Sequence, residues 1–314
     1  MQAITKLVTH GRTELAKVIV GQSELIDGTL TALLCGGHAL IEGVPGLGKT
    51  LSVKVLARAL NVTFQRVQCT SDLMPADLLG SNILNLQNGT FSLHHGPMFT
   101  DLLLVDEVNR MPPRTQASLL ESMEERQVTV DGVRHSLSPL FTVLATQNPV
   151  EFEGTYPLPE AQLDRFLLKI KIGYPSAQEE LEILAKHNSQ PTSLTEAAEI
   201  APIEPEVFEQ ARLELRQLTV EPSLLGYISE IARRTRTWPS VSLGASPRAG
   251  ISLMLVAKAL AALADRDYVI PDDVKAAVLP ALRHRIVLRP EAELEGLDAD
   301  RVLTDVLAAV EVPK

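Results

Sequence analysis

Short apolar runs alternate with segments of helical periodicity through the first half of the chain. Runs such as DLLLVD at 101–106 are apolar at nearly every position, which is typical of strands buried on both faces of a sheet. Between the runs, apolar residues recur every three to four positions, as at 49–60 and 113–125. This alternation predicts a parallel sheet covered by helices on both faces. The predicted strands are 38–42, 63–68, 101–106, 141–146 and 166–172.

Two segments of alternating polarity interrupt this order. Asn88-Gly89 and Asp131-Gly132 each lie between alternating runs, within 80–97 and 125–139, which indicates a β-hairpin with a type I′ turn. A simple βαβ sheet needs neither hairpin, so both are candidates for functional projections. Surface hairpins without a function are the alternative.

The strand pattern disappears after residue 175. A stretch rich in Pro, Ser and Thr at 187–205 is typical of a linker. We therefore expect an α/β domain over 1–174 and a smaller, all-helical domain over 175–314. The helices predicted there are 176–187, 205–218, 222–236, 247–265 and 271–285.

Composition and charge narrow the function classes. With 314 residues and 45% hydrophobic content, the chain has enough apolar material for two globular domains. Its 39 acidic residues exceed its 29 basic ones, which gives a formal charge of −10. A negative chain without a basic cluster repels a phosphate backbone, so its charge disfavours a nucleic-acid partner.

The cysteines, the N-terminal segment and the length of the apolar runs indicate the cellular compartment. The two cysteines, Cys35 and Cys69, lie far apart and in no metal-ligand spacing, as expected for a reduced intracellular protein. The N-terminus lacks the apolar core of a secretion signal, and no apolar run approaches the ~20 residues that span a bilayer. We expect a soluble, cytoplasmic protein with no transmembrane segment.

The stretch LIEGVPGLGKT at 40–50 carries the first chemical signal. Gly43, Gly48, Lys49 and Thr50 satisfy the pattern G-x-x-x-x-G-K-[ST], with a predicted strand before it and a predicted helix after it. The glycines let backbone N–H groups surround phosphate oxygens, and the helix N-terminus adds positive potential. Lys49 would reach the β- and γ-phosphates, and the Thr50 hydroxyl would ligate Mg²⁺. The alternative is a glycine-rich turn with an incidental lysine.

Two acidic residues end the predicted strand at 101–106. A P-loop enzyme needs a carboxylate on a neighbouring strand to hold hydrated Mg²⁺, and Asp106 supplies it. Glu107 then stands where it can accept a proton from the attacking water. A solvated strand end is the alternative, which the nearby P-loop disfavours.

Longer motifs resemble one family. The chain contains GVPGLGKT, LLLVDEVNRMPPRTQASLLESMEERQVTVDG, LATQNPVEFEGTYPLPEAQLDRF and GASPRAG. Together they resemble the MoxR family of AAA+ ATPases over nearly the whole chain. The resemblance implies an α/β P-loop AAA+ core with a parallel five-stranded sheet and inserted β-hairpins, followed by a small helical lid. It also implies ATP and Mg²⁺ as cofactors.

The resemblance assigns further residues to the site. Asn148 matches sensor 1, which orients the lytic water. Arg165 matches the arginine finger offered to a neighbouring subunit, although an ion pair with Asp164 or Glu160 is the alternative. Arg248 matches sensor 2, with which the lid reaches back to the γ-phosphate. The segments expected to contact the nucleotide comprise Val20, Gly21 and Gln22 beside adenine, and Pro45, Gly46 and Leu47 in the P-loop.

The implied activity is ATP hydrolysis to ADP and phosphate by a ring, in this family a hexamer, that remodels or matures protein clients. Von Willebrand factor A domain proteins are the partners that the resemblance suggests. The hairpins match two inserts that project toward the centre of such rings. Their tips, LQNGTF and VDGVR, carry almost no net positive charge, which favours a protein client. A nucleic-acid-dependent motor and a nucleotide-gated assembly switch with little turnover are the alternatives.

Overall fold

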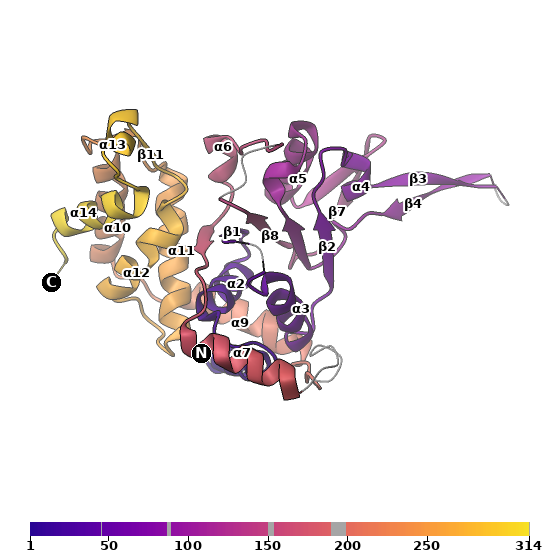
Figure 1. Ribbon diagram of the computed structural model, residues 1–314, viewed down its shortest axis with the longest axis horizontal. Helices are drawn as coiled ribbons and strands as arrows, with labels where there is room; N and C mark the ends of the chain where they lie inside the picture. Colours follow the sequence, from indigo (N-terminus) through magenta and orange to yellow (C-terminus); the bar gives the residue numbers. More distant parts are fainter. Residues whose placement is uncertain (45, 87–88, 150–153, 190–198, 314) are drawn as a thin grey trace.

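The computed structural model describes residues 1–44, 46–86, 89–149, 154–189 and 199–313. An α/β body occupies the middle of the molecule (Figure 1). A group of helices from the C-terminal part lies on one side of the body, and a long hairpin projects from the other side.

The α/β body is built on a parallel sheet whose strands have the order β2-β5-β8-β1-β9. The predicted fold class and all five predicted strands are confirmed. The interior strand β5 is buried at every position, in agreement with its continuous apolar run. The strands are β1 (Ala39–Glu42), β2 (Phe64–Gln68), β5 (Leu102–Asp106), β8 (Thr142–Gln147) and β9 (Leu168–Lys171).

Both faces of the sheet are covered. Successive side chains of a strand point to opposite faces, so Leu102 and Leu104 join one hydrophobic cluster, whereas Leu103 and Val105 join the other. The first cluster includes α1 (Gln2–Ala16), α2 (Ser23–Cys35) and α3 (Lys49–Ala59), and the second includes α5 (Pro113–Glu125). Short helices α4 (Pro75–Leu79), η1 (Val108–Arg110) and α6 (Glu160–Leu163) complete this part.

Two antiparallel hairpins interrupt the parallel sheet, as predicted. They are β3 (Gly80–Asn85) with β4 (Thr90–His95), and β6 (Gln127–Val130) with β7 (Val133–Ser136). Asp131 and Gly132 have φ angles of 49° and 80°, which is the left-handed geometry of a type I′ turn. Gly89 also has a positive φ of 66°, whereas Asn88 lies outside the described residues.

The C-terminal half is mainly helical, as predicted. The sequence pattern did not indicate its short antiparallel ladder of β10 (Val241–Leu243) and β11 (Val287–Leu288), nor an isolated bridge between Thr219 and Tyr268. None of the helices that the structure describes has both the length and the apolar character that a bilayer crossing requires. The helices are α7 (Ala177–Ser189), α9 (Pro205–Gln217), α10 (Pro222–Arg236), α11 (Pro247–Leu263), α12 (Pro271–Leu282), α13 (Pro290–Leu294) and α14 (Ala299–Ala309).

Helices α7 and α9 lie beneath the α/β body, away from the group formed by α10 to α14 (Figure 1). Glu214 of α9 accepts hydrogen bonds from the backbone N–H groups of Ala3 and Ile4, at 3.2 and 3.0 Å. This carboxylate therefore satisfies donors at the N-terminus of α1 and complements its dipole. A domain boundary at residue 174 stays a prediction.

Candidate functional site

The predicted P-loop lies between the carboxyl end of β1 and the N-terminus of α3. Gly46 and Gly48 have φ angles of 86° and 72°, and no atom lies within 4 Å of a Cβ built on either residue. The backbone conformation, rather than the space, therefore requires glycine there. Pro45 lies outside the described residues. Helix α3 begins at Lys49, so its free N–H groups face the loop.

Lys49 closes this loop. Its Nζ atom donates a hydrogen bond to the carbonyl oxygen of Gly43 over 2.7 Å. Burial lowers the pKa of Lys49, while the nearby carboxylates of Asp106 and Glu107 raise it. A positive charge thus lies at the P-loop, beside the N-terminus of α3, and both features favour a phosphate there.

Asp106 lies opposite, at the carboxyl end of β5. Its Oδ2 atom accepts from the Thr50 hydroxyl at 3.4 Å and from Nε of Arg66 at 2.6 Å. Its Oδ1 atom accepts from the Thr146 hydroxyl at 3.3 Å. The Asp106 carboxylate is buried, and carboxylate and hydroxyl oxygens are ligands that Mg²⁺ prefers. The oxygen donors of Thr50 and Asp106 therefore fit the predicted magnesium position.

Glu107 has an unusual backbone conformation. Its φ angle is 58°, which is uncommon for a residue other than glycine and is one of the backbone conformations that recur at active sites. Its N–H donates to the Thr146 hydroxyl at 2.9 Å, and its carboxylate pairs with Nε of Arg110 at 2.9 Å. Asn148 is also buried and follows β8, which neighbours β5 in the sheet. Thr146 therefore links the two strands that carry Asp106, Glu107 and Asn148.

A cavity of about 340 Å³ adjoins the P-loop and is lined on one side by α7. Its lining includes Val20 and Gln22, which were expected beside adenine, and also Ile19, Tyr174 and Ile183. Within the described part of the chain, nothing hydrogen-bonds the buried Oε1 atom of Gln22. This orphan acceptor and the apolar lining fit a nucleobase that carries an amino group.

The P-loop residues Leu47, Gly46 and Gly48 also line this cavity. Gly21 does not line it but lies close to α7, since a Cβ there would come within 2.5 Å of the Glu179 carboxylate. The cavity and the P-loop therefore form one continuous site at the carboxyl edge of the sheet.

Several residues of this site were not predicted from the sequence. Arg66 and Thr146 lie within strands, where one polar residue carries no recognisable signal. Tyr174 and Ile183 lie far along the chain from the P-loop, and only the packing of α7 brings them to the cavity. The one sequence feature that could have indicated Arg66 is its charge, which is unusual in a strand next to the one that carries Asp106.

Arg165 and Arg248 lie elsewhere. Arg165 pairs with Oε2 of Glu124 at 3.2 Å, and Arg248 pairs with Oε1 of the same carboxylate at 3.1 Å. The partner of Arg165 is thus Glu124, which is neither of the two carboxylates expected from sequence. Glu124 belongs to the last turn of α5.

This shared carboxylate marks the amino edge of the sheet. His38, which precedes β1, accepts from the N–H of Val143 at 2.9 Å and bonds the carbonyl of Met123 at 3.1 Å. The N–H of Leu167 donates to the carbonyl of His38 at 2.8 Å. The starts of β1, β8 and β9 and the end of α5 therefore meet here.

The strands of four to six residues separate this edge from the P-loop by about 13 to 20 Å, at about 3.3 Å per residue. In this structure Arg248 therefore lies away from the P-loop of its own chain, and its role as sensor 2 stays a prediction. The lid helix α11 carries Arg248 to the amino edge instead, beside Arg165.

Comparisons with known proteins agree with the fold. Residues 38–168 match the ATPase family associated with various cellular activities (AAA), and residues 233–306 match the AAA lid domain. A candidate ATPase from Cytophaga hutchinsonii, known from its crystal structure, is 40% identical with a TM-score of 0.90, and the match covers 100% of this chain and 98% of that one.

Two curated relatives match along nearly the whole chain. The protein YeaC of Bacillus subtilis is 46% identical, over 95% of this chain and 92% of its own length. Chaperone MoxR1 of Mycobacterium tuberculosis is 39% identical, over 96% of this chain and 81% of its own length. The similarity therefore extends through both the α/β body and the lid.

Proposed function

Because the chain belongs to the MoxR family of AAA+ ATPases, we propose that it is a Mg²⁺-dependent ATPase that works as a hexameric ring and remodels or matures protein clients. The observation that carries the proposal is the separation of two sets of residues. Phosphate and metal ligands lie at the carboxyl edge of the sheet, and two arginines lie at the amino edge.

The carboxyl edge holds the chain's own nucleotide. The backbone donors of the P-loop and the ammonium group of Lys49 bind the phosphates, while Thr50 and Asp106 hold the metal. Bound Mg²⁺ neutralises charge on the phosphate oxygens. Glu107 accepts the proton of the attacking water, and the Asn148 amide orients that water. Thr146 keeps both strands in register, since it bonds Asp106 and the backbone of Glu107.

The cavity beside the P-loop takes the base. Val20 supplies an apolar surface, and the free acceptor of Gln22 receives a hydrogen bond from the amino group of adenine. Gly21 lets the chain pass close to α7. Adenine matches this arrangement better than guanine, since guanine presents a carbonyl where adenine presents its amino group.

The amino edge serves a neighbouring subunit. Arg165 and Arg248 lie at the opposite end of the strands from their own P-loop, so a second copy must bring its nucleotide to them. A guanidinium there stabilises charge that develops in phosphoryl transfer. Repetition of this head-to-tail contact generates a closed ring.

The long hairpin β3–β4 is the proposed client contact. It projects from the body (Figure 1) and exposes apolar side chains, among which Leu86 is 87% and Phe91 is 70% exposed. Residues 80–95 contain no Lys or Arg, whereas a contact with a phosphate backbone would need them. The name of the mycobacterial relative supports a chaperone role, and the family resemblance supports partners with von Willebrand factor A domains. The free cysteines fit a cytoplasmic location.

Mixing of inactive variants tests this arrangement. Glu107→Gln retains both arginines but lacks the base, and Arg165→Ala retains the base but lacks the finger. Each alone should be inactive, whereas a 1:1 mixture should regain activity at roughly a quarter of its interfaces. The pair Arg248→Ala and Glu107→Gln should behave in the same way. If the mixture with Arg165→Ala does not recover activity, Arg165 does not act on a neighbour's nucleotide. If only the mixture with Arg248→Ala fails to recover, Arg248 acts on the nucleotide of its own chain.

DNA addition separates the two client classes. Single- or double-stranded DNA should leave the hydrolysis rate unchanged in the proposed chaperone. Stimulation of several fold would instead favour the nucleic-acid-dependent motor. Negligible turnover of the assembled wild-type protein would favour the nucleotide-gated switch.

A further inference from the structure

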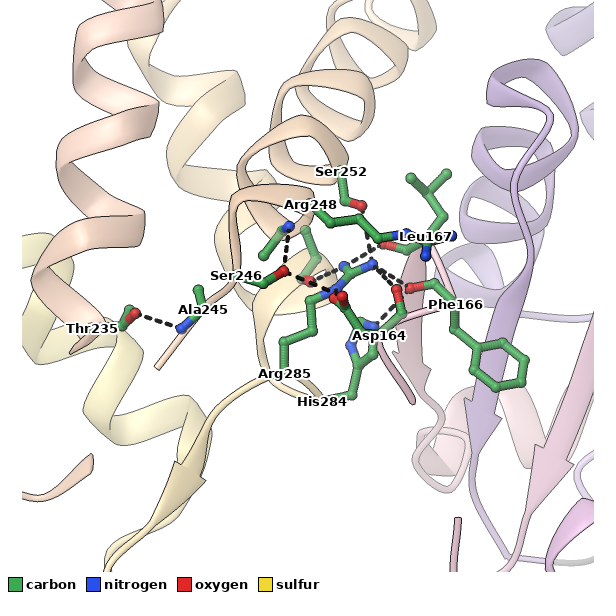
Figure 2. Close-up of polar contacts among 12 residues, drawn as sticks. Asp164, Phe166, Leu167, Thr235, Ala245, Ser246, Arg248, Ser252, His284 and Arg285 are labelled. Atoms are coloured by element: carbon green, nitrogen blue, oxygen red, sulfur yellow. Dashed lines mark hydrogen bonds and ion pairs between the residues drawn. The ribbon is translucent and has the colours of Figure 1, made fainter. Parts of the chain in front are cut away.

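Arg285 is a buried arginine of the lid that binds the segment around Arg165. It follows α12, and its side chain is only 2% exposed. Its Nε atom donates to Oδ1 of Asp164 at 2.7 Å, and its two Nη atoms donate to the carbonyls of Asp164, Phe166 and Leu167 at 3.0, 2.6 and 3.0 Å. Figure 2 shows the guanidinium reaching these groups from the lid.

Other lid residues bind the same segment. The ring nitrogen Nε2 of His284 bonds the carbonyl of Phe166 at 2.9 Å. Burial lowers the pKa of His284 well below its usual value, so the neutral ring donates its Nε2 proton. Ser246, which precedes α11, donates to Oδ2 of Asp164 at 3.2 Å. The lid thus bonds the residues on both sides of Arg165.

A buried guanidinium in this place is not explained by stability alone. Removing a charge from water is unfavourable, and apolar replacements of buried ion pairs often leave a protein equally stable or more stable. An arginine adds defined geometry, because its planar guanidinium holds several hydrogen-bond acceptors in fixed relative positions. Here the guanidinium joins two acceptors of the lid, the carbonyl of Ala281 and the hydroxyl of Ser252, to the acceptors beside Arg165. The acceptors beside Arg165 belong to Asp164, Phe166 and Leu167.

We propose that Arg285 is a positioning residue, which sets the place of Arg165 according to the orientation of the lid. The proposal rests on the proposed role of Arg165 toward a neighbouring nucleotide. Because the backbone on both sides of Arg165 is bonded to the lid, a rotation of the lid displaces Arg165 with it. Arg248, on the first turn of α11, moves in the same body. The lid of one subunit thereby controls hydrolysis in the next.

The test uses Arg285→Lys, which keeps the charge but loses the fork. Misplacing a catalytic group by about 1 Å can reduce the rate about 100-fold, so we expect the pure variant to lose about 10- to 100-fold in kcat. ATP binding, measured with the Glu107→Gln background, should not change. Mixing Arg285→Lys with Glu107→Gln should restore activity, because each subunit then supplies what its neighbour lacks.

Arg283 offers a matched control. It is also an arginine of the lid with little exposure, and its Nε pairs with Asp300 at 3.0 Å, but it does not bond residues 164–167. Arg283→Lys should retain wild-type kcat. Should Arg285→Lys fail to fold, Asp164→Asn removes the charge partner with little change of shape, and it should show the same recovery in mixtures.

The outcomes distinguish a failure of the role proposed for Arg285 from a failure of the proposed function. If Arg165→Ala recovers with Glu107→Gln but a folded Arg285→Lys or Asp164→Asn does not, Arg285 serves its own subunit and the inference is wrong. Full kcat in pure Arg285→Lys also overturns it. If neither Arg165→Ala nor Arg285→Lys recovers, the proposed function itself fails.

Discussion

Arg66 donates from Nε to Oδ2 of Asp106 over 2.6 Å, and this is the same oxygen that accepts from the Thr50 hydroxyl. Arg66 belongs to β2 at the edge of the sheet, and its side chain is half exposed. A guanidinium thus occupies one side of the carboxylate that would hold the metal. Metal and arginine therefore compete for one negative charge.

We expect Arg66→Gln to bind Mg²⁺ more tightly in the presence of ATP. Half-exposed ion pairs contribute about 0.2–1 kcal/mol, which corresponds to at most about a fivefold lower Mg²⁺ requirement. Magnesium titration of nucleotide binding measures the change. Arg58→Gln, two turns beyond Thr50 on α3, should leave the requirement unaltered. An equal shift in both variants would indicate a general charge effect.

Lys49→Ala and Glu107→Gln should separate binding from hydrolysis. Lys49→Ala removes the ammonium group that spans the P-loop, so nucleotide affinity should be lost. Glu107→Gln keeps the loop intact, so it should bind ATP while kcat falls about 100-fold or more. Equilibrium binding and steady-state turnover measure the two effects. Normal turnover in Glu107→Gln would remove Glu107 from the role of base.

The stability of the fold should depend on pH through His38. Burial lowers the pKa of this residue to about 4, although its hydrogen bond to Met123 acts in the other direction. The folded pKa lies below the unfolded value of 6.5, so the unfolded state binds more protons as the pH falls between these values. The fold should lose about 3 kcal/mol over this window.

Denaturation at several pH values measures this loss, and His38→Gln should reduce the slope below pH 6.5. A slope remains because burial also lowers the pKa of His284. Parallel stability curves for wild type and His38→Gln would show that His38 does not titrate on unfolding.

Phe141 and Phe91 should differ in their effect on stability. Phe141 is fully buried in the cluster beneath α5, so Phe141→Ala should destabilise the fold by about 3–5 kcal/mol. Phe91 is 70% exposed on the long hairpin, so Phe91→Ala should change the free energy of unfolding by less than about 0.5 kcal/mol. Chemical denaturation tests both. A large loss in Phe91→Ala would mean that the hairpin packs against another surface.

Much of the α/β body could be predicted because each strand is specified locally. The run DLLLVD has the pattern of a strand buried on both faces, and the P-loop spacing fixes the glycines that its φ angles need. The carboxyl edge then followed, since parallel strands bring their ends together. Asp106, Thr50 and Lys49 accordingly lie together in the structure.

The position of Arg248 could not be predicted in this way. Its place depends on how the lid sits against the sheet, and that is fixed by contacts between distant residues, such as Arg285 with Asp164. Neither residue has a local signal for this pairing. The cavity beside the P-loop is similar, because Ile183 reaches it only through the packing of α7. Local pattern specifies elements, whereas these sites depend on the arrangement of elements.

The placement of the phosphate ligands and the arginine pair at opposite edges also affects kinetics. If every working site consists of one edge from each of two chains, a dissociated chain contains two half-sites and no whole one. The turnover per chain should then fall on dilution, with an order in protein above one. The specific activity of the protein would then depend on its own concentration.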